Sequence, residues 1–107
     1  MKIINTRAHE IVVLDQKGNI IKIFPKSPAP ARCNEATTDV ANVEGVPIVK
    51  KVYSSPYNLP PHKAGTLLIV SRVVKDALPD RPDLVVPAEL VRDSNKKVVA
   101  CKALSIH

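Results

Sequence analysis

Cationic and hydrogen-bonding side chains gather where a short helix is predicted to begin. Ser71 follows a strongly apolar run and precedes Arg72, which places this serine at a helix N-cap. Arg81 and Asp83 follow within one short loop. The first amide groups of a helix have no internal partner and carry partial positive charge, so they favour an anion. The predicted chemistry is therefore the binding of a phosphate or carboxylate by the helix amides with Arg72 or Arg81.

The same residues also fit a purely structural interpretation. The N-cap serine then only stabilises the helix, and Arg72 pairs with Asp76 one turn further on. Arg81 pairs in turn with Asp80 or Asp83. Caps and ion pairs at this spacing are common on helices, so the sequence leaves both interpretations open.

A second polar cluster, Asn5, Thr6 and His9, lies between the first two predicted strands. These side chains could point into one pocket and bind the polar edges of a ligand. Alternatively, they satisfy the backbone groups of their own turn. The complete set of candidate ligand-binding residues is Asn5, Thr6, His9, Arg32, Ser71, Arg72, Arg81 and Asp83.

The sequence contains no recognised catalytic or metal-binding motif. The three histidines and two cysteines lack any recognised zinc spacing. Ser71 lacks the flanking glycines of a nucleophile elbow, and there is no P-loop or dinucleotide-binding glycine motif. We therefore expect a protein that is not an enzyme, with no catalytic residue, no metal and no cofactor.

The formal net charge of +6 and the isoelectric point near 9.6 favour an anionic partner. A nucleic acid, a nucleotide or an acidic protein surface would each fit, and a merely solubilising charge is the alternative. Tyr53 and Tyr57 are the only aromatic residues placed to stack on bases, and the paired lysines at 50–51 and 96–97 form no stripe. These features argue against nucleic acid and leave an anionic small molecule as the preferred partner.

The sequence also indicates a compartment. No apolar run approaches the roughly 20 residues needed to span a bilayer, and the N-terminal residues lack the apolar region of a signal peptide. We expect no membrane partner and a cytoplasmic location. Cys33 and Cys101 are accordingly predicted to be free, buried residues without a disulfide.

The fold class predicted from these patterns is mainly β (α+β), in one domain over residues 1–107. We expect a small sandwich or open barrel of about seven or eight short strands with one short helix. Residues 34–45 are predicted as a strand fragment followed by a mobile loop, and the proline-rich residues 25–31 and 54–64 as exposed connections. The helix is expected over 72–78, ending before Pro79. The predicted strands are 2–6, 10–15, 19–24, 46–53, 66–70, 83–86 closed by Pro87, and 98–104, which forms a hairpin with 90–92.

The order of several motifs resembles a group of small, mostly uncharacterised proteins of phages and prophages. The motifs are Asn5, Thr6, His9, Ile11 and Val12, then G-x-P-I-V at 45–49, G-T-x-x-I-V-S at 65–71, A-L-P-x-R-x-D-x-V-V-P at 77–87, V-R-D at 91–93 and V-V-x-C at 98–101. The resemblance implies a phage-type binding protein acting in the host cytoplasm. Phage counter-defence proteins include sponges that trap nucleotide immune signals and direct inhibitors of host proteins.

By that analogy we expect a non-enzymatic protein that sequesters an anionic small molecule, most directly a nucleotide immune signal. The alternative is a protein–protein inhibitor of a host factor, or a phage accessory protein, that uses the proline-rich loops at 25–30 and 56–61. Because one small β domain offers only a shallow cleft, we also expect a homo-oligomer.

Overall fold

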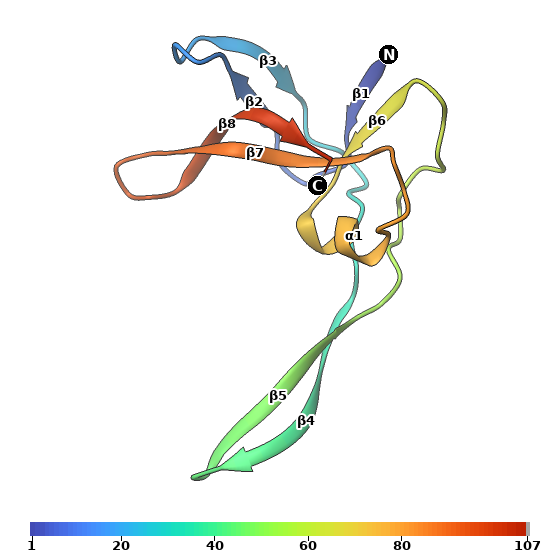
Figure 1. Ribbon diagram of the computed structural model, residues 1–107, viewed down its shortest axis with the longest axis vertical. Coiled ribbons are helices and arrows are strands. Elements are labelled where there is room, and N and C mark those ends of the chain that lie inside the picture. The colour runs from blue at the N-terminus through green and yellow to red at the C-terminus, as the bar shows by residue number, and fades with distance from the viewer. Residues whose placement is uncertain (107) are drawn as a thin grey trace.

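The computed structural model describes residues 1–106, which form eight strands and one short helix (Figure 1). This confirms the predicted mainly-β class. No helix among these residues is both long enough and apolar enough to cross a bilayer. The elements are β1 (Lys2–Asn5), β2 (Ile11–Leu14), β3 (Ile20–Phe24), β4 (Glu35–Val43), β5 (Val46–Tyr53), β6 (Thr66–Ile69), α1 (Arg72–Ala77), β7 (Leu84–Arg92) and β8 (Val98–Ser105).

Six strands form the body of the protein in the order β1-β6-β7-β8-β2-β3. Strands β1, β6 and β7 run parallel, whereas β7 and β8 form an antiparallel hairpin. A parallel contact between Val13 and Cys101 then joins β2 to β8. The strands change direction strongly around the body, which gives the open barrel-like form that the strand pattern predicted (Figure 1).

Strand β6 is buried on both faces, as its continuous apolar sequence predicted. Ile69 belongs to one core cluster with Leu67 packed against it, and Leu68 and Val70 belong to a second cluster. Val74 of the helix completes the second cluster. Alternation of side chains along a strand is what lets four consecutive apolar residues serve two cores.

The helix begins and ends as its flanking residues predict, within one residue. The Ser71 hydroxyl oxygen accepts a hydrogen bond from the Val74 amide at 3.2 Å, which is an N-cap. The helix ends at Ala77, one residue earlier than predicted, and Leu78 is its C-cap. Pro79 follows directly after this cap.

The prediction that Pro87 closes a strand was wrong. Strand β7 continues through this proline to Arg92 and pairs with β8 along that length. Neighbouring β6 pairs with β7 only as far as Val85, so residue 87 lies beyond the end of β6. A proline is tolerated there because no strand on that side needs its missing amide hydrogen.

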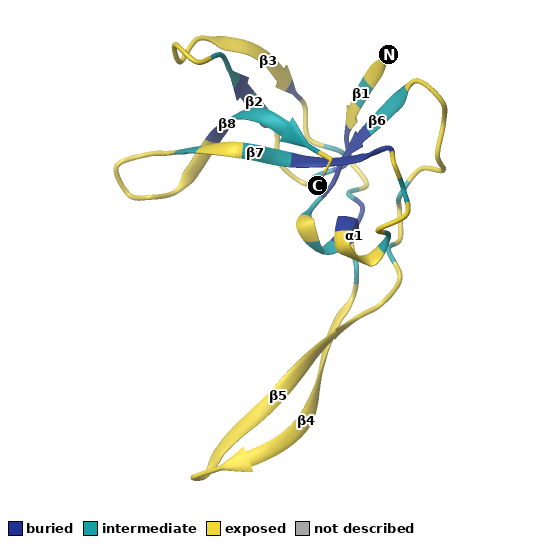
Figure 2. Ribbon diagram, viewed as in Figure 1, coloured by how far each residue is buried: buried dark blue, intermediate teal, exposed yellow. Residues whose placement is uncertain are grey.

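The prediction of a mobile loop within residues 34–45 was also wrong. Strands β4 and β5 pair over their whole length as an antiparallel hairpin, here called the arm. Its turn is Glu44-Gly45, and both residues have positive φ, 55° and 80°, as a tight two-residue hairpin turn requires. The arm projects from the body, and every one of its residues is exposed (Figures 1 and 2).

Backbone hydrogen bonds hold the two connections at the base of the arm together. Arg32 and Tyr57 exchange two such bonds, at 3.2 and 2.9 Å, and the Ser54 amide donates to the Asn34 carbonyl. The proline-rich connection that precedes the arm, residues 25–31, is held to the body as well. Its Ala31 amide donates a hydrogen bond to the carbonyl oxygen of Thr6. The proline-rich segments thus run beside the body as non-strand connections, as predicted.

Candidate anion-binding cleft

A cleft of about 730 Å³ lies among the turn after β1, the start of α1 and strands β2, β7 and β8. This volume falls within the range of roughly 300–1,000 Å³ that is usual for small-molecule sites. Most of its lining is apolar, so the cleft can accept an apolar or aromatic group. The apolar lining residues are Ile11, Val12, Val86, Pro87, Leu90, Val98, Val99, Ala100 and Cys101.

The charged lining of this cleft is mainly cationic. Arg7, Arg72 and Lys97 contribute three positive charges and Glu10 one negative charge, a net charge of +2 when His9 is neutral. His9 is an exposed residue, and its Nδ1 lies 3.1 Å from the Glu10 carbonyl oxygen. The cleft therefore favours a negatively charged ligand.

The two arginines of the cleft are not neutralised by acidic neighbours. Among residues 1–106, neither the Arg7 nor the Arg72 guanidinium makes an ion pair or a side-chain hydrogen bond. The alternative Arg72–Asp76 pair is consequently not formed. Burial and the nearby charge of Arg32 both lower the pKa of Arg7. A bound anion would relieve this repulsion and restore the solvation that the guanidinium lacks.

Asn5 and Thr6 are buried and hold the polar turn together. The Asn5 Nδ2 donates to the carbonyl oxygens of His9 at 2.9 Å and Pro25 at 3.1 Å. Its Oδ1 accepts a hydrogen bond from the Arg7 amide at 2.9 Å, and the Thr6 hydroxyl donates to the Ile69 carbonyl at 2.7 Å. These two residues therefore place Arg7 and His9 at the cleft without lining it themselves.

Arg81 and Asp83 form an ion pair outside the cleft. The Arg81 Nη2 lies 2.7 Å from the Asp83 Oδ2, and a second nitrogen of the same guanidinium donates to the other carboxylate oxygen at 2.8 Å. Arg81 also donates to the Pro60 carbonyl at 3.2 Å. The hydrogen bonds from Arg81 lower the pKa of the buried Asp83 carboxyl. This is the pairing that the structural interpretation of the sequence predicted.

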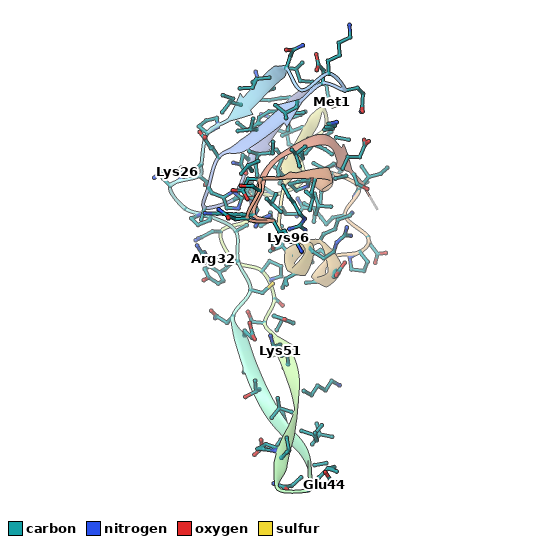
Figure 3. All side chains as sticks on the ribbon, turned by 90° about the vertical axis from the view of Figure 1, so that its left-hand side faces the viewer. Met1, Lys26, Arg32, Glu44, Lys51 and Lys96 are labelled. Carbon is teal, nitrogen blue, oxygen red and sulfur yellow. The ribbon has the colours of Figure 1, made fainter. Side chains whose placement is uncertain are left out.

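The structure therefore divides the candidate residues among several places. His9 and Arg72 line the cleft, while Arg72 and Arg81 line a second depression of about 490 Å³ whose charged lining also includes Lys75, Asp76 and Asp80. The exposed Arg32 lies at the base of the arm (Figure 3). The Val74 amide of the six-residue helix already bonds Ser71, which leaves less of the helix end for an anion than the sequence suggested.

Sequence reasoning missed Arg7, Lys97 and the apolar lining of the cleft. Arg7 lies inside the polar segment 5–9, so its position was a usable signal. Lys97 ends a turn, and nothing local indicates that β8 would pair beside β2 and bring it near Arg7. The apolar lining comes from β2 and from the β7–β8 hairpin, which is distant from β2 in the sequence.

The cysteines and histidines form no metal site in the part of the chain that the structure describes. Both cysteines are free. Cys101 is buried as predicted, and its thiol approaches the Val12 carbonyl at 3.6 Å, whereas Cys33 is only half-buried. Burial raises the pKa of the Cys101 thiol, which keeps it protonated and unreactive at neutral pH.

A scan against protein-family models matched no family, and searches of curated proteins and of solved structures matched no protein. The residues of the cleft are therefore the basis on which a function is assigned.

Proposed function

We propose that this protein is a non-enzymatic binding protein that sequesters an anionic small molecule in the 730 Å³ cleft. The observation that carries the proposal is the combination of an apolar lining with two arginines, Arg7 and Arg72, that have no acidic partner among the described residues. A nucleotide has the matching chemistry, because it joins a flat ring system to negatively charged phosphates. With the resemblance to phage proteins, the ligand we propose is a nucleotide immune signal of the host cytoplasm.

The charged groups of the cleft are suited to binding phosphate. An arginine guanidinium presents several N–H donors in a planar fork that matches two phosphate oxygens at once. Arg72 is exposed and makes no ion pair with any described residue, so it can reach a ligand without first breaking one. Arg7 is half-buried beside the charge of Arg32, so an anion that pairs with the Arg7 guanidinium would offset this like-charge repulsion.

A thermal-shift and calorimetry panel of cyclic dinucleotides, cyclic ADP-ribose and ADP-ribose tests this function. A ligand present at 100 times its dissociation constant should stabilise the fold by roughly 2.7 kcal/mol. Arg72→Ala should abolish that stabilisation while leaving the unliganded protein as stable as the wild type. Arg92→Ala is the matched control, because Arg92 is also exposed but bonds only the Lys96 carbonyl and does not line the cleft.

Two results would count against the proposal. One is a wild-type protein that none of these nucleotides stabilises. The other is an Arg72→Ala variant that binds as tightly as Arg92→Ala, since the affinity would then come from elsewhere on the surface.

A further inference from the structure

The arm has one apolar face and one largely polar face. Residues directly opposite in an antiparallel pair point to the same side, and alternate pairs point to opposite sides. The observed register, with its irregularity between Asp39 and Ala41, therefore places six small or branched apolar residues on one side, interrupted by Thr38 and Lys50. This surface, the apolar face of the arm, consists of Ala36, Ala41, Val43, Val46, Ile48 and Val52.

The body of the same chain does not cover this face. Val43 and Val46 are each 56% exposed, and Ile48 is 44% exposed. The arm points away from the body in two perpendicular views (Figures 1 and 3). An isolated two-stranded ribbon is at best marginally stable in water, so the arm needs another surface to pack against.

The charge distribution indicates what that surface is. The arm, residues 35–53, carries Glu35, Asp39 and Glu44 against Lys50 and Lys51, a net charge of −1. The remaining residues therefore carry +7, which together with the −1 of the arm gives the total of +6. Glu35 pairs with Lys51 at 3.3 Å, which leaves Asp39 in the middle of β4, on the largely polar face, and Glu44 in the turn at the tip. Glu44 makes the tip of the arm acidic, so the tip complements a basic body, whereas Lys50, the one charged residue on the apolar face, lies four positions along β5 from Val46.

The body also offers an apolar surface of matching kind. Strand β3 ends the order of the six-stranded sheet, so within the described part of the chain one of its edges is unpaired. Ile21 and Ile23 on this strand are 61% and 46% exposed. Lys22 lies between them, and Lys17 and Lys26 flank the strand in sequence. Lys22 and Ile23 point to opposite faces of β3, and the Lys22 ammonium lies 5.7 Å from the centre of the Phe24 ring, so the positive charge beside the isoleucines comes from Lys17 and Lys26 near the two ends of the strand.

We propose that the arm docks on a second copy of this chain, with its apolar face against β3 of that copy and its acidic tip near the lysines there. A second copy supplies both halves of the interface wherever the protein is made. This inference does not rest on the proposed ligand, because neither the arm nor β3 lines the cleft.

The mass of the full chain in solution tests this proposal by light scattering after size exclusion and by native mass spectrometry. The wild type should assemble to at least twice the 11.6 kDa of one chain. Ile48→Lys on the arm and Ile21→Lys on β3 should each weaken self-association by at least about tenfold, because each replaces a branched apolar side chain that the interface would bury. Thr37→Lys adds the same charge to the opposite face of the arm, away from the acidic tip, and should remain assembled.

Folding is monitored in the same samples by circular dichroism. The arm contributes no residue to either core cluster, so the monomeric variants should keep the body of the wild type. If Ile48→Lys is poorly folded, Ile48→Ser replaces it, with the same expected dissociation. A wild-type protein that stays monomeric at tens of micromolar overturns the proposal. A monomeric wild type that binds a host protein through the arm overturns it as well. Assembly by Ile48→Lys as strong as by Thr37→Lys also overturns it.

Discussion

Replacing Asn5 with alanine should lower the free energy of unfolding substantially, although this residue was a ligand-binding candidate from the sequence. The Asn5 side chain is only 7% exposed and makes three hydrogen bonds of 2.9 to 3.1 Å to the backbone of His9, Pro25 and Arg7. A buried hydrogen bond contributes about 1 kcal/mol, and an orphaned buried partner adds a penalty, so the expected loss is about 3 kcal/mol.

Urea and thermal unfolding followed by circular dichroism measure this loss. For a domain of this size, about 3 kcal/mol corresponds to a fall in Tm of about 12–24 °C. Asn95→Ala is the control, because Asn95 is exposed and only its backbone amide is bonded, to Asp93. The control should stay within about 0.5 kcal/mol of the wild type. An Asn5→Ala protein of wild-type stability that no longer binds a nucleotide would refute the structural role and make Asn5 a ligand contact.

Two further changes test other parts of the fold. Asp83→Asn should destabilise the protein at neutral pH by about 2–3 kcal/mol, because it breaks a charged, buried hydrogen-bonded pair with Arg81. Since Arg81 lowers the pKa of Asp83 in the folded state, the pair stabilises fully above the ordinary value of 3.8 and less as the pH falls through the lowered pKa. Urea titrations from pH 7 to pH 3 should therefore show the gap between Asp83→Asn and wild type narrowing with acid, and a constant gap would contradict this. Gly18→Ala should lower the free energy of unfolding by about 1 kcal/mol, because residue 18 has a φ of 88°, which an alanine adopts at a cost. The added Cβ itself would meet no atom within 4 Å, so the loss comes from the backbone conformation alone. Thermal unfolding measures the loss, and an unchanged Tm would show that the turn can readjust.

Short-range signals were sufficient to predict the elements that local chemistry determines. The β2–β3 hairpin follows from two apolar runs around a turn. In this turn the Asp15 carboxylate accepts hydrogen bonds from the backbone amides of Lys17 and Asn19. The helix start follows from Ser71, and its end from Pro79. In each case the deciding residues lie within about five positions of one another, where turn and capping preferences apply.

Tertiary context decided the elements that the sequence could not predict. Residues 35–43 mix four β-branched residues that favour strands with five residues that disfavour them, and pairing with β5 makes them a nine-residue strand. Pro87 stops a strand only where a neighbour needs its amide, and that depends on where β6 ends. The cleft likewise needs the contact between Val13 and Cys101, which no local pattern indicates.

The polar segment at 5–9 shows how burial assigns different roles to neighbouring residues. Asn5 and Thr6 are buried, and a buried polar side chain must find protein partners, so they are committed to backbone carbonyl and amide groups. Arg7 and His9 are more exposed and their side chains reach the cleft, so they remain available to a ligand. The same segment therefore contains both the support and the contacts of the proposed site. Substitutions at positions 5 and 6 should act first on stability, whereas substitutions at positions 7 and 9 should act first on affinity.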